Sequence, residues 1–378
     1  MKLGIDASRN RSGGAVAHMI GLIGAAEPEQ SGIEEVHVWS HAKLLRALPD
    51  RPWLVRHNPP ELERGILSQL YWQRYRFSYE LERMGCGIVF NTDAGSIGRF
   101  APSVTMSQDM LSYEPGEMER MRWGKARIRL FLLRYMQNQS LRNANGAIFL
   151  TKYASELIQR SCKGVSNVKI IPHGVHESFR GCKNPQTLSL YHEKEIQCLY
   201  VSNVATYKHQ WHVVRAIAKL RSAGYPLKLT LIGGGDDASQ RRLDTEILAS
   251  DPSGAFVTQH PFLDNDKLPQ IFSESDLFIF ASSCENMPIT LIEGMAAGLP
   301  IACSDRGPMP EVLRDGGVYF NPEKPSSIVS AVRVLLDNSE LWTQWAQRSM
   351  KISDEYSWKR CADETFAFLA EIYKKDMR

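Results

Sequence analysis

Short apolar runs alternate with longer amphipathic segments along the whole chain. The runs predict strands at residues 2–6, 36–40, 87–91, 104–107, 146–150 and 168–171, and again at 196–202, 227–233, 255–259, 277–281, 299–303 and 316–320. The segments between them have helical periodicity, as in residues 209–224, where Lys219, Arg221 and Gly224 form a typical helix end. Nearly continuous apolar strands separated by helices are typical of parallel sheets, so the pattern predicts an α/β fold.

Two such series of strands and helices predict two Rossmann-like domains. A chain of 378 residues is long for one hydrophobic core. Proline and glycine residues interrupt the pattern at 170–186, which indicates the boundary there. We expect one domain over residues 1–175, a second over 176–355, and a last segment over 356–378. The last helix has no strand after it, so it must pack on structure that is already built.

Composition narrows the functional classes. The seven cysteines are scattered without a Cys-x-x-Cys pair, which argues against a zinc site or a redox motif and fits a reducing compartment. Neither a signal peptide nor an apolar run near the ~18 residues of a membrane span is visible, so we expect a cytoplasmic protein.

Residues 1–180 carry 24 basic and 17 acidic side chains (+7), against 21 and 25 (−4) in the remainder. An anionic partner should therefore meet the first half.

The stretch SSCENMPITLIEGMAAGLPI, residues 282–301, joins a predicted strand directly to a predicted helix. Such a helix starts at the carboxyl edge of a parallel sheet, where ligands bind in open α/β folds. Pro288 suits the first turn. Backbone amides around Met287, Ile289 and Thr290 are expected to face a phosphate, which the helix dipole favours.

Glu285 precedes this helix and Glu293 lies on its second turn. Carboxylates accept two hydrogen bonds from neighbouring hydroxyls, so a ligand rich in diols fits the pair. The alternative is that both are surface glutamates, because this spacing arises often by chance. The small residues Ala296, Ala297 and Gly298 let the helix pack closely. The turn between strand and helix also lies where ligands bind, which favours a functional role for the two glutamates.

Glycines follow other predicted strands. Gly233, Gly234 and Gly235 allow a nucleotide to approach the backbone, but without a complete G-x-G-x-x-G a dinucleotide cofactor has little support. Gly13 and Gly14 open the first predicted helix, where a simple tight turn is the alternative.

Together these motifs resemble the retaining glycosyltransferases of family four, whose GT-B fold has two Rossmann-like domains with parallel sheets facing an interdomain cleft. That family usually has Glu, Gly, aromatic, Gly and then Leu-Glu-Ala-Met-Ala; here the chain reads Glu285-Asn286-Met287-Pro288 and Ile292-Glu293-Gly294-Met295-Ala296. The departures, which include Asn286 and Met287, fall near the donor sugar and leave its identity open.

The resemblance assigns roles in the donor domain. Glu285 would orient the sugar hydroxyls, and Glu293 would bind the ribose. Lys208 would bind the donor diphosphate, although a solvated lysine at a helix start is the alternative. Asn203 stands where the family usually has arginine, so one cation is lost and only hydrogen bonding remains. Gly234 matches a Gly-x-Gly at the nucleotide.

On the acceptor side, Gly13 and Gly14 resemble the family's Gly-Gly loop. Gln108 and Asp109 stand where many relatives have His-Asp, and Gln108 cannot act as a base. His173 lies in an interdomain His-Gly-Val segment, either near the sugar or as a hydrogen-bonded hinge residue. The pair Asp264 and Asp266 is expected to cap a helix and not to hold a metal.

The resemblance implies a metal-independent retaining glycosyltransferase that needs no cofactor. It would transfer a hexose from a nucleoside diphosphate sugar, GDP-mannose or a related GDP-sugar being favoured, to a lipid-linked glycan such as an O-antigen or lipopolysaccharide. The alternatives are a non-catalytic nucleotide-sugar-binding subunit and a Rossmann oxidoreductase. Nucleic-acid binding has no recognition motif to support it.

Residues 120–142 carry seven basic side chains and no acidic one, interleaved with Trp123, Leu130, Phe131, Leu133 and Tyr135. A basic helix with aromatic residues suits an anionic membrane surface, and the basic aromatic stretch at 71–83 points the same way. A domain helix with one solvated face is the alternative. We therefore expect a cytoplasmic protein that is peripheral on the inner membrane face.

Overall fold

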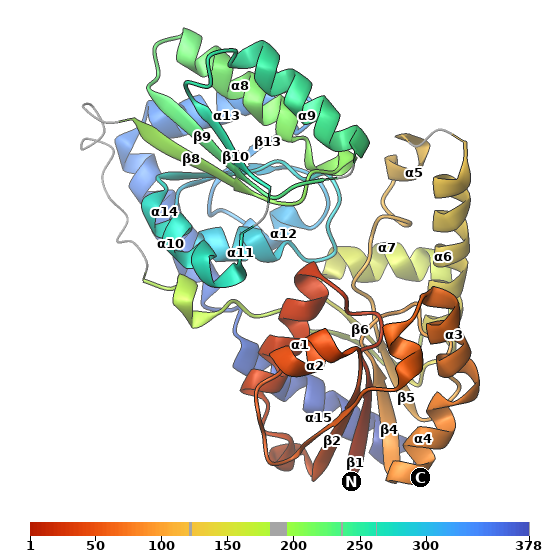
Figure 1. Ribbon diagram of the computed structural model, residues 1–378. Coiled ribbons are helices and arrows are strands. Elements are labelled where there is room, and N and C mark those ends of the chain that lie inside the picture. The colour runs from red at the N-terminus through yellow and green to blue at the C-terminus, as the bar shows by residue number, and fades with distance from the viewer. Residues whose placement is uncertain (121–122, 182–194, 236, 262, 378) are drawn as a thin grey trace. The chain divides into compact units, whose positions relative to one another are not determined.

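The computed structural model describes residues 1–120, 123–181, 195–235, 237–261 and 263–377. It divides into two compact units, each built on one parallel sheet (Figure 1). The first unit comprises Met1–Gly174 and Ser357–Arg378, and the second comprises Val175–Tyr356. The predicted α/β class with parallel sheets is confirmed.

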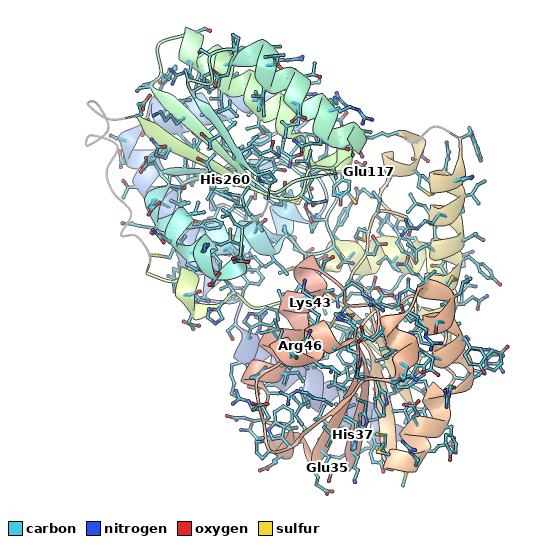
Figure 2. The ribbon with its side chains drawn as sticks, in the orientation of Figure 1. Glu35, His37, Lys43, Arg46, Glu117 and His260 are labelled. Carbon is cyan, nitrogen blue, oxygen red and sulfur yellow. The ribbon has the colours of Figure 1, made fainter. Side chains whose placement is uncertain are left out.

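Seven parallel strands in the order β3-β2-β1-β4-β5-β6-β7 form the sheet of the first unit. The strands are β1 (Lys2–Asp6), β2 (Glu35–Trp39), β3 (Leu54–His57), β4 (Cys86–Asn91), β5 (Ser103–Met106), β6 (Gly146–Phe149) and β7 (Val168–Ile170). Figure 2 shows Glu35 and His37 together near the start of β2, so they mark the edge opposite the one where ligands bind in such sheets.

The helices of this unit fall on two faces of its sheet. They are α1 (Gly13–Ala25), α2 (Ala42–Ala47), α3 (Ile66–Tyr75), α4 (Phe77–Met84), α5 (Glu117–Arg120), α6 (Lys125–Asn143), α7 (Lys152–Cys162) and α15 (Trp358–Asp376). The chain steps one way from β1 to β3 and the opposite way from β3 to β7. Because parallel crossovers are right-handed, α1 and α2 cover one face, while α3, α4, α6 and α7 cover the other.

The final helix, α15, packs against α1, β4 and β5. This confirms that it needs structure built earlier in the chain. A Cβ added at Gly21 or Gly174 would lie 2.2 Å or 2.1 Å from an atom of Trp358, so two glycines admit the start of α15.

Six parallel strands in the order β10-β9-β8-β11-β12-β13 form the sheet of the second unit. They are β8 (Ile196–Val201), β9 (Leu227–Ile232), β10 (Val257–His260), β11 (Leu277–Phe280), β12 (Ile301–Ser304) and β13 (Val318–Phe320). The helices are α8 (Gln210–Ser222), α9 (Asp237–Ser250), α10 (Leu268–Glu274), α11 (Ile289–Ala296), α12 (Met309–Leu313), α13 (Pro325–Leu336) and α14 (Ser339–Ser353).

All twelve strands predicted from apolar runs are present, with ends shifted by a residue or two. The strand that the pattern missed is β3, which reads LVRH. It is one of the two edge strands of its sheet and is only partly buried, so it carries Arg56 and His57 where a central strand would be apolar.

Candidate functional site

The central pair of strands in the second unit, β8 and β11, forms a topological switch point. From β8 the chain moves outward through β9 to β10, then returns across the sheet to β11 on the other side of β8. The loops that follow β8 and β11 therefore leave the same edge in opposite senses. A crevice at such a point is where open α/β sheets bind ligands.

Lys208 and Glu285 meet at this edge. Lys208 ends the short 3-10 turn Thr206–Lys208 after β8, and Glu285 lies in the loop after β11. The Lys208 Nζ contacts Glu285 Oε1 in an ion pair whose side chains are only 10% and 15% exposed. The ammonium also lies 5.3 Å from the Tyr207 ring centre and 5.8 Å from that of Phe280. A lysine so placed can still direct two N–H groups toward a ligand.

Several hydrogen bonds fix the two loops against one another. The Tyr200 hydroxyl donates to the Lys208 carbonyl at 2.7 Å. The Ser283 amide donates to the Tyr207 carbonyl at 2.8 Å, and the Ser283 hydroxyl lies 3.0 Å from His209 Nε2. The position of Lys208 relative to Glu285 is therefore set by backbone contacts and does not depend on the ion pair alone.

These supporting residues were not identified from the sequence. Ser283 and His209 carry no motif, and His209 is held at φ 51°, in the left-handed region. The available signal was their position, since His209 directly follows Lys208 and Ser283 lies in the loop between β11 and Glu285.

Glu293 lies on α11, which begins at Ile289 as the strand–helix pattern predicted. A Cβ added at Gly294 would lie 2.7 Å from the Phe278 ring, so glycine lets α11 pack closely on β11. The Glu293 Oε2 atom is buried and has no hydrogen-bond partner among the described residues. Burial raises the pKa of this carboxyl to about 7. An unpaired carboxylate of this kind gains by accepting hydrogen bonds from a ligand.

The helix start differs from the expectation in one respect. The Ile289 amide donates to the Met287 carbonyl at 3.0 Å, so it is not free for a phosphate. The prediction of a free amide at Ile289 was wrong, because Pro288 turns the chain tightly just before the helix. Asn286 and Met287 are buried, while Thr290 is partly exposed on the first turn.

The glycine loop after β9 packs directly on the loop after β8. Gly233 has φ 119°, and a Cβ there would lie 2.1 Å from the Ser202 carbonyl oxygen. The Val204 amide donates to the Gly234 carbonyl at 2.9 Å, and the Gly233 amide donates to that of His260 at 2.8 Å. His260, labelled in Figure 2, ends β10. Close backbone packing therefore requires glycine at position 233 whether or not a nucleotide is bound.

Asn203 lies in the same loop with its side chain exposed. Its carbonyl accepts from Gln210 Nε2 at 3.0 Å, which ties the loop to α8. The structure therefore brings nine predicted donor-side residues to one edge of the second unit, namely Asn203, Lys208, Gly234, Glu285, Asn286, Met287, Ile289, Thr290 and Glu293.

The predicted acceptor-side residues all lie in the first unit. Gly13 begins α1 with φ 59°, and Gly14 follows it. His173 is buried after β7, with its Nδ1 3.0 Å from Nδ1 of His18 on α1. Burial lowers the pKa of His18 to about 3 and that of His173 well below its usual value, so this pair is neutral at pH 7. The arrangement matches the alternative of a hydrogen-bonded histidine.

Gln108 and Asp109 follow β5 at the carboxyl edge of the first sheet. The Gln108 Nε2 donates to the Thr92 carbonyl at 2.7 Å, and Asp109 Oδ1 accepts from the Leu111 amide at 3.0 Å. Gln108 thus connects the ends of β4 and β5, and both side chains are partly exposed.

One group of potential metal ligands occurs among the described residues. The ligand atoms of His18, His173 and Cys361 lie within 4.8 Å of one another and are buried. The two imidazoles already hydrogen-bond each other, and all three residues belong to the first unit, whereas the donor-side set belongs to the second. The expected capping by Asp264 and Asp266 was wrong, because Lys267 precedes α10 and no side chain caps that helix.

Residues 188–351 match the family described as "Glycosyl transferases group 1". The match covers the switch point and every donor-side residue named above. Most of the second unit is therefore similar to the group 1 glycosyltransferases.

Curated relatives match over part of the chain. The D-inositol 3-phosphate glycosyltransferase of Rhodococcus erythropolis is 26% identical over 187 residues, which are 48% of this chain and 41% of that protein. The O-antigen chain mannosyltransferase B of Escherichia coli is 25% identical over 105 residues, which are 28% of this chain and 27% of that protein. The chain thus spans less than half the length of these relatives.

Solved structures match over the whole chain. The sucrose-phosphate synthase of Thermosynechococcus elongatus superposes with a TM-score of 0.75 at 14% identity, covering 100% of this chain and 99% of that one. Anabaena HepE in complex with UDP-glucose gives a TM-score of 0.72 at 16% identity, with coverage of 99% and 100%. The fold is therefore that of the GT-B glycosyltransferases.

No helix among the described residues combines the length and the apolar character needed to cross a bilayer.

Proposed function

We propose that this protein is a retaining glycosyltransferase that moves a hexose from a nucleoside diphosphate sugar to a glycan. The observation that carries the proposal is the meeting of Lys208 and Glu285 at the β8–β11 switch point, with Glu293, one oxygen of which is buried and unpaired, on the adjoining helix. The Lys208 cation suits the diphosphate of the donor, and the Glu285 carboxylate suits its sugar. The unpaired carboxylate oxygen of Glu293 suits its ribose. The group 1 match over the same residues supports this assignment.

The reaction breaks the bond between the anomeric carbon and the diphosphate oxygen, which leaves with the electron pair. Lys208 stabilises the negative charge that develops on this oxygen. The acceptor hydroxyl forms its new bond on the same face of the sugar, and its proton passes to the departing phosphate. Glu285 holds the sugar hydroxyls and Glu293 the ribose. Because the first carboxylate is paired with Lys208, it suits orientation better than nucleophilic attack.

GDP-mannose or a related GDP-sugar is the preferred donor in this proposal, with support from the similarity to an O-antigen mannosyltransferase. The similarity to HepE, solved with UDP-glucose, makes uridine donors the alternative to be tested. The acceptor is a polyprenyl-linked or lipopolysaccharide-type glycan at the cytoplasmic side of a membrane. Residues 120–142 would meet the anionic surface there; of these, Met121 and Arg122 lie outside the described residues.

Positive charge on Lys208 takes the role that a metal ion has in other transferases, so the proposed reaction proceeds without metal. Turnover in the presence of EDTA tests this point, and a requirement for added Mg²⁺ or Mn²⁺ would contradict it.

A non-catalytic nucleotide-sugar-binding subunit is the second candidate, favoured by Asn203 at the position of an expected arginine. Donor hydrolysis across a panel of GDP-, UDP- and ADP-sugars separates the two. Release of nucleoside diphosphate from any donor supports the enzyme, whereas saturable donor binding without release supports the subunit.

A further inference from the structure

Large apolar side chains are exposed mainly on two segments of the first unit. Five lie on α3 and α4, and five lie on residues 123–135 around the start of α6. They are Ile66, Leu67, Tyr71, Tyr75 and Tyr79 on the first segment, and Trp123, Ile128, Phe131, Leu132 and Tyr135 on the second. Leu67 is 80% exposed and Trp123 77%. Clustering of this kind marks an interaction surface, since single exposed apolar residues are normally scattered.

The α3–α4 stripe is a fixed feature of the fold. Leu67, Tyr71, Tyr75 and Tyr79 recur every four residues along one side, with the Tyr71 and Tyr75 ring centres 5.3 Å apart. On the opposite side Trp72, Phe77 and Leu81 are fully buried in a cluster with Trp39. The stripe is therefore held outward by packing on its inner side.

Both exposed segments cover the same face of the sheet. The crossover rule places α3, α4 and α6 on the face opposite α1 and α2, and α4 contacts β4 while α6 contacts β5. Figure 1 shows α3, α4 and α6 along the right-hand side of the first unit. The structure corrects one detail of the expected α6 surface, because Leu130 is buried whereas Ile128 and Leu132 are exposed.

The charge of the stripe fits an anionic partner. Residues 64–79 contain Arg64, Arg74 and Arg76 and no acidic side chain. Three of the flanking carboxylates are engaged within the unit: Glu61 pairs with Arg76, Glu63 accepts from the Ala42 amide and Asn58, and Glu80 accepts hydrogen bonds from two buried indoles. Glu82, beside Arg83, is exposed. Tyrosine with arginine at a water-exposed helix face is the composition that binds the interfacial region of an anionic bilayer.

A pocket of about 400 Å³ opens at the end of the stripe. Its charged and aromatic lining comprises three arginines, two carboxylates, a histidine and a tyrosine: Arg56, Arg76, Arg83, Glu61, Glu80, His57 and Tyr79. Arg83, in the last turn of α4, forms no ion pair with a described residue. A phosphate group in this pocket would meet the unpaired guanidinium of Arg83. Beside it lie Arg56 and Arg76, whose carboxylate partners are Asp50 and Glu61.

We propose that the α3–α4 stripe and this pocket form a second lipid-docking element beside α6, with the pocket receiving the phosphate headgroup of an anionic phospholipid. The element deepens the proposed function, on which its purpose rests, because it would hold the enzyme where a lipid-linked acceptor resides. Two separated contacts on one face would bind more tightly than either alone and would fix the orientation of the first unit.

Flotation of the full chain with phosphatidylglycerol vesicles tests the proposal, with phosphatidylcholine vesicles as the neutral comparison. We expect binding to the anionic vesicles only. The double substitution Leu67→Ser and Tyr75→Ser should lower the partition coefficient roughly tenfold. Arg83→Gln should lower it about fivefold, as expected for one arginine near an anionic surface.

The matched control is the pair Leu248→Ser and Arg241→Gln on α9 of the second unit, where Leu248 is 70% exposed. Partition of this control should equal that of the unaltered protein. Unchanged vesicle binding by the stripe variant and by Arg83→Gln, or an equal loss in the control, would overturn the proposal. The proposal would also be overturned if Arg83→Gln weakened the binding of inorganic phosphate but left the binding of vesicles unchanged.

Donor hydrolysis measured in the same samples separates the two proposals. Vesicle binding without hydrolysis would contradict the enzymatic function and leave the docking element intact. Hydrolysis without vesicle binding would contradict the docking element and leave the enzymatic function intact.

Discussion

Replacing Glu293 by glutamine should stabilise the protein at alkaline pH while weakening donor binding. The carboxyl is held in the second unit with one oxygen buried and unpaired, and burial raises its pKa to about 7. A protonated side chain is buried here at a lower cost than an ionised one, which is held without a partner until a ligand arrives. Glutamine keeps the shape of the side chain and removes the ionisation.

The size of the effect follows from the shift. An ordinary glutamic acid titrates at 4.5 in the unfolded chain, so the folded protein binds the proton more tightly than the unfolded chain. The stabilising contribution of protonation is therefore complete below 4.5 and is lost as the pH rises toward 7. Relative to glutamine, the native carboxyl should become about 2.5 kcal/mol more costly between pH 5 and pH 8.

Urea unfolding of both proteins at pH 5 and pH 8 measures this difference. We expect the free energy of unfolding of Glu293→Gln to exceed that of the unaltered protein by a margin that grows with pH. Donor affinity should behave in the opposite way: in the unaltered protein it should rise about tenfold from pH 6 to pH 8 as the carboxylate forms. A pH-independent difference in unfolding, with a flat affinity profile, would refute the reasoning.

Three further substitutions test the remaining parts of the donor site. Lys208→Met should lower kcat/KM at least about 100-fold, because the developing phosphate charge loses its cation and Glu285 loses its partner; steady-state kinetics would contradict this if turnover were normal. Asn203→Arg should raise donor affinity roughly tenfold by restoring a charged contact, measured by calorimetry, and unchanged affinity would show that Asn203 lies away from the diphosphate. Gly233→Ala should lower stability by roughly 2 kcal/mol or more, since φ 119° is strained for alanine and the Cβ would meet the Ser202 carbonyl; an unshifted Tm would contradict the close packing.

Much of the fold was predictable because apolar periodicity determines which segments are buried on both sides. The twelve strands other than β3 were visible as apolar runs, including the edge strand β10, which is preceded directly by Ala255 and Phe256. The edge strand β3 was not, because its residues Arg56 and His57 are only partly buried and lack the apolar signal. Topology placed Lys208 and Glu285 at the same sheet edge even though 77 positions separate them.

The details of the site depended on backbone geometry that periodicity does not encode. In the turn at Pro288 the Ile289 amide donates a hydrogen bond to the Met287 carbonyl, and Lys208 pairs directly with Glu285. Similarly, the α3–α4 stripe is exposed because Trp72 and Phe77 occupy the core on the other side of the helices, which the sequence alone does not show. Spacing along a helix gives the two sides, but the fold decides which side faces the sheet.

The central claim is that the Lys208, Glu285 and Glu293 constellation transfers a sugar. The most direct measurement is the release of nucleoside diphosphate from a panel of sugar donors, with the anomeric configuration of any product followed by proton NMR. We predict turnover of at least one donor with retained configuration, and none in folded Lys208→Ala and Glu293→Ala variants. Normal turnover in both variants, or an inverted product, would contradict the account.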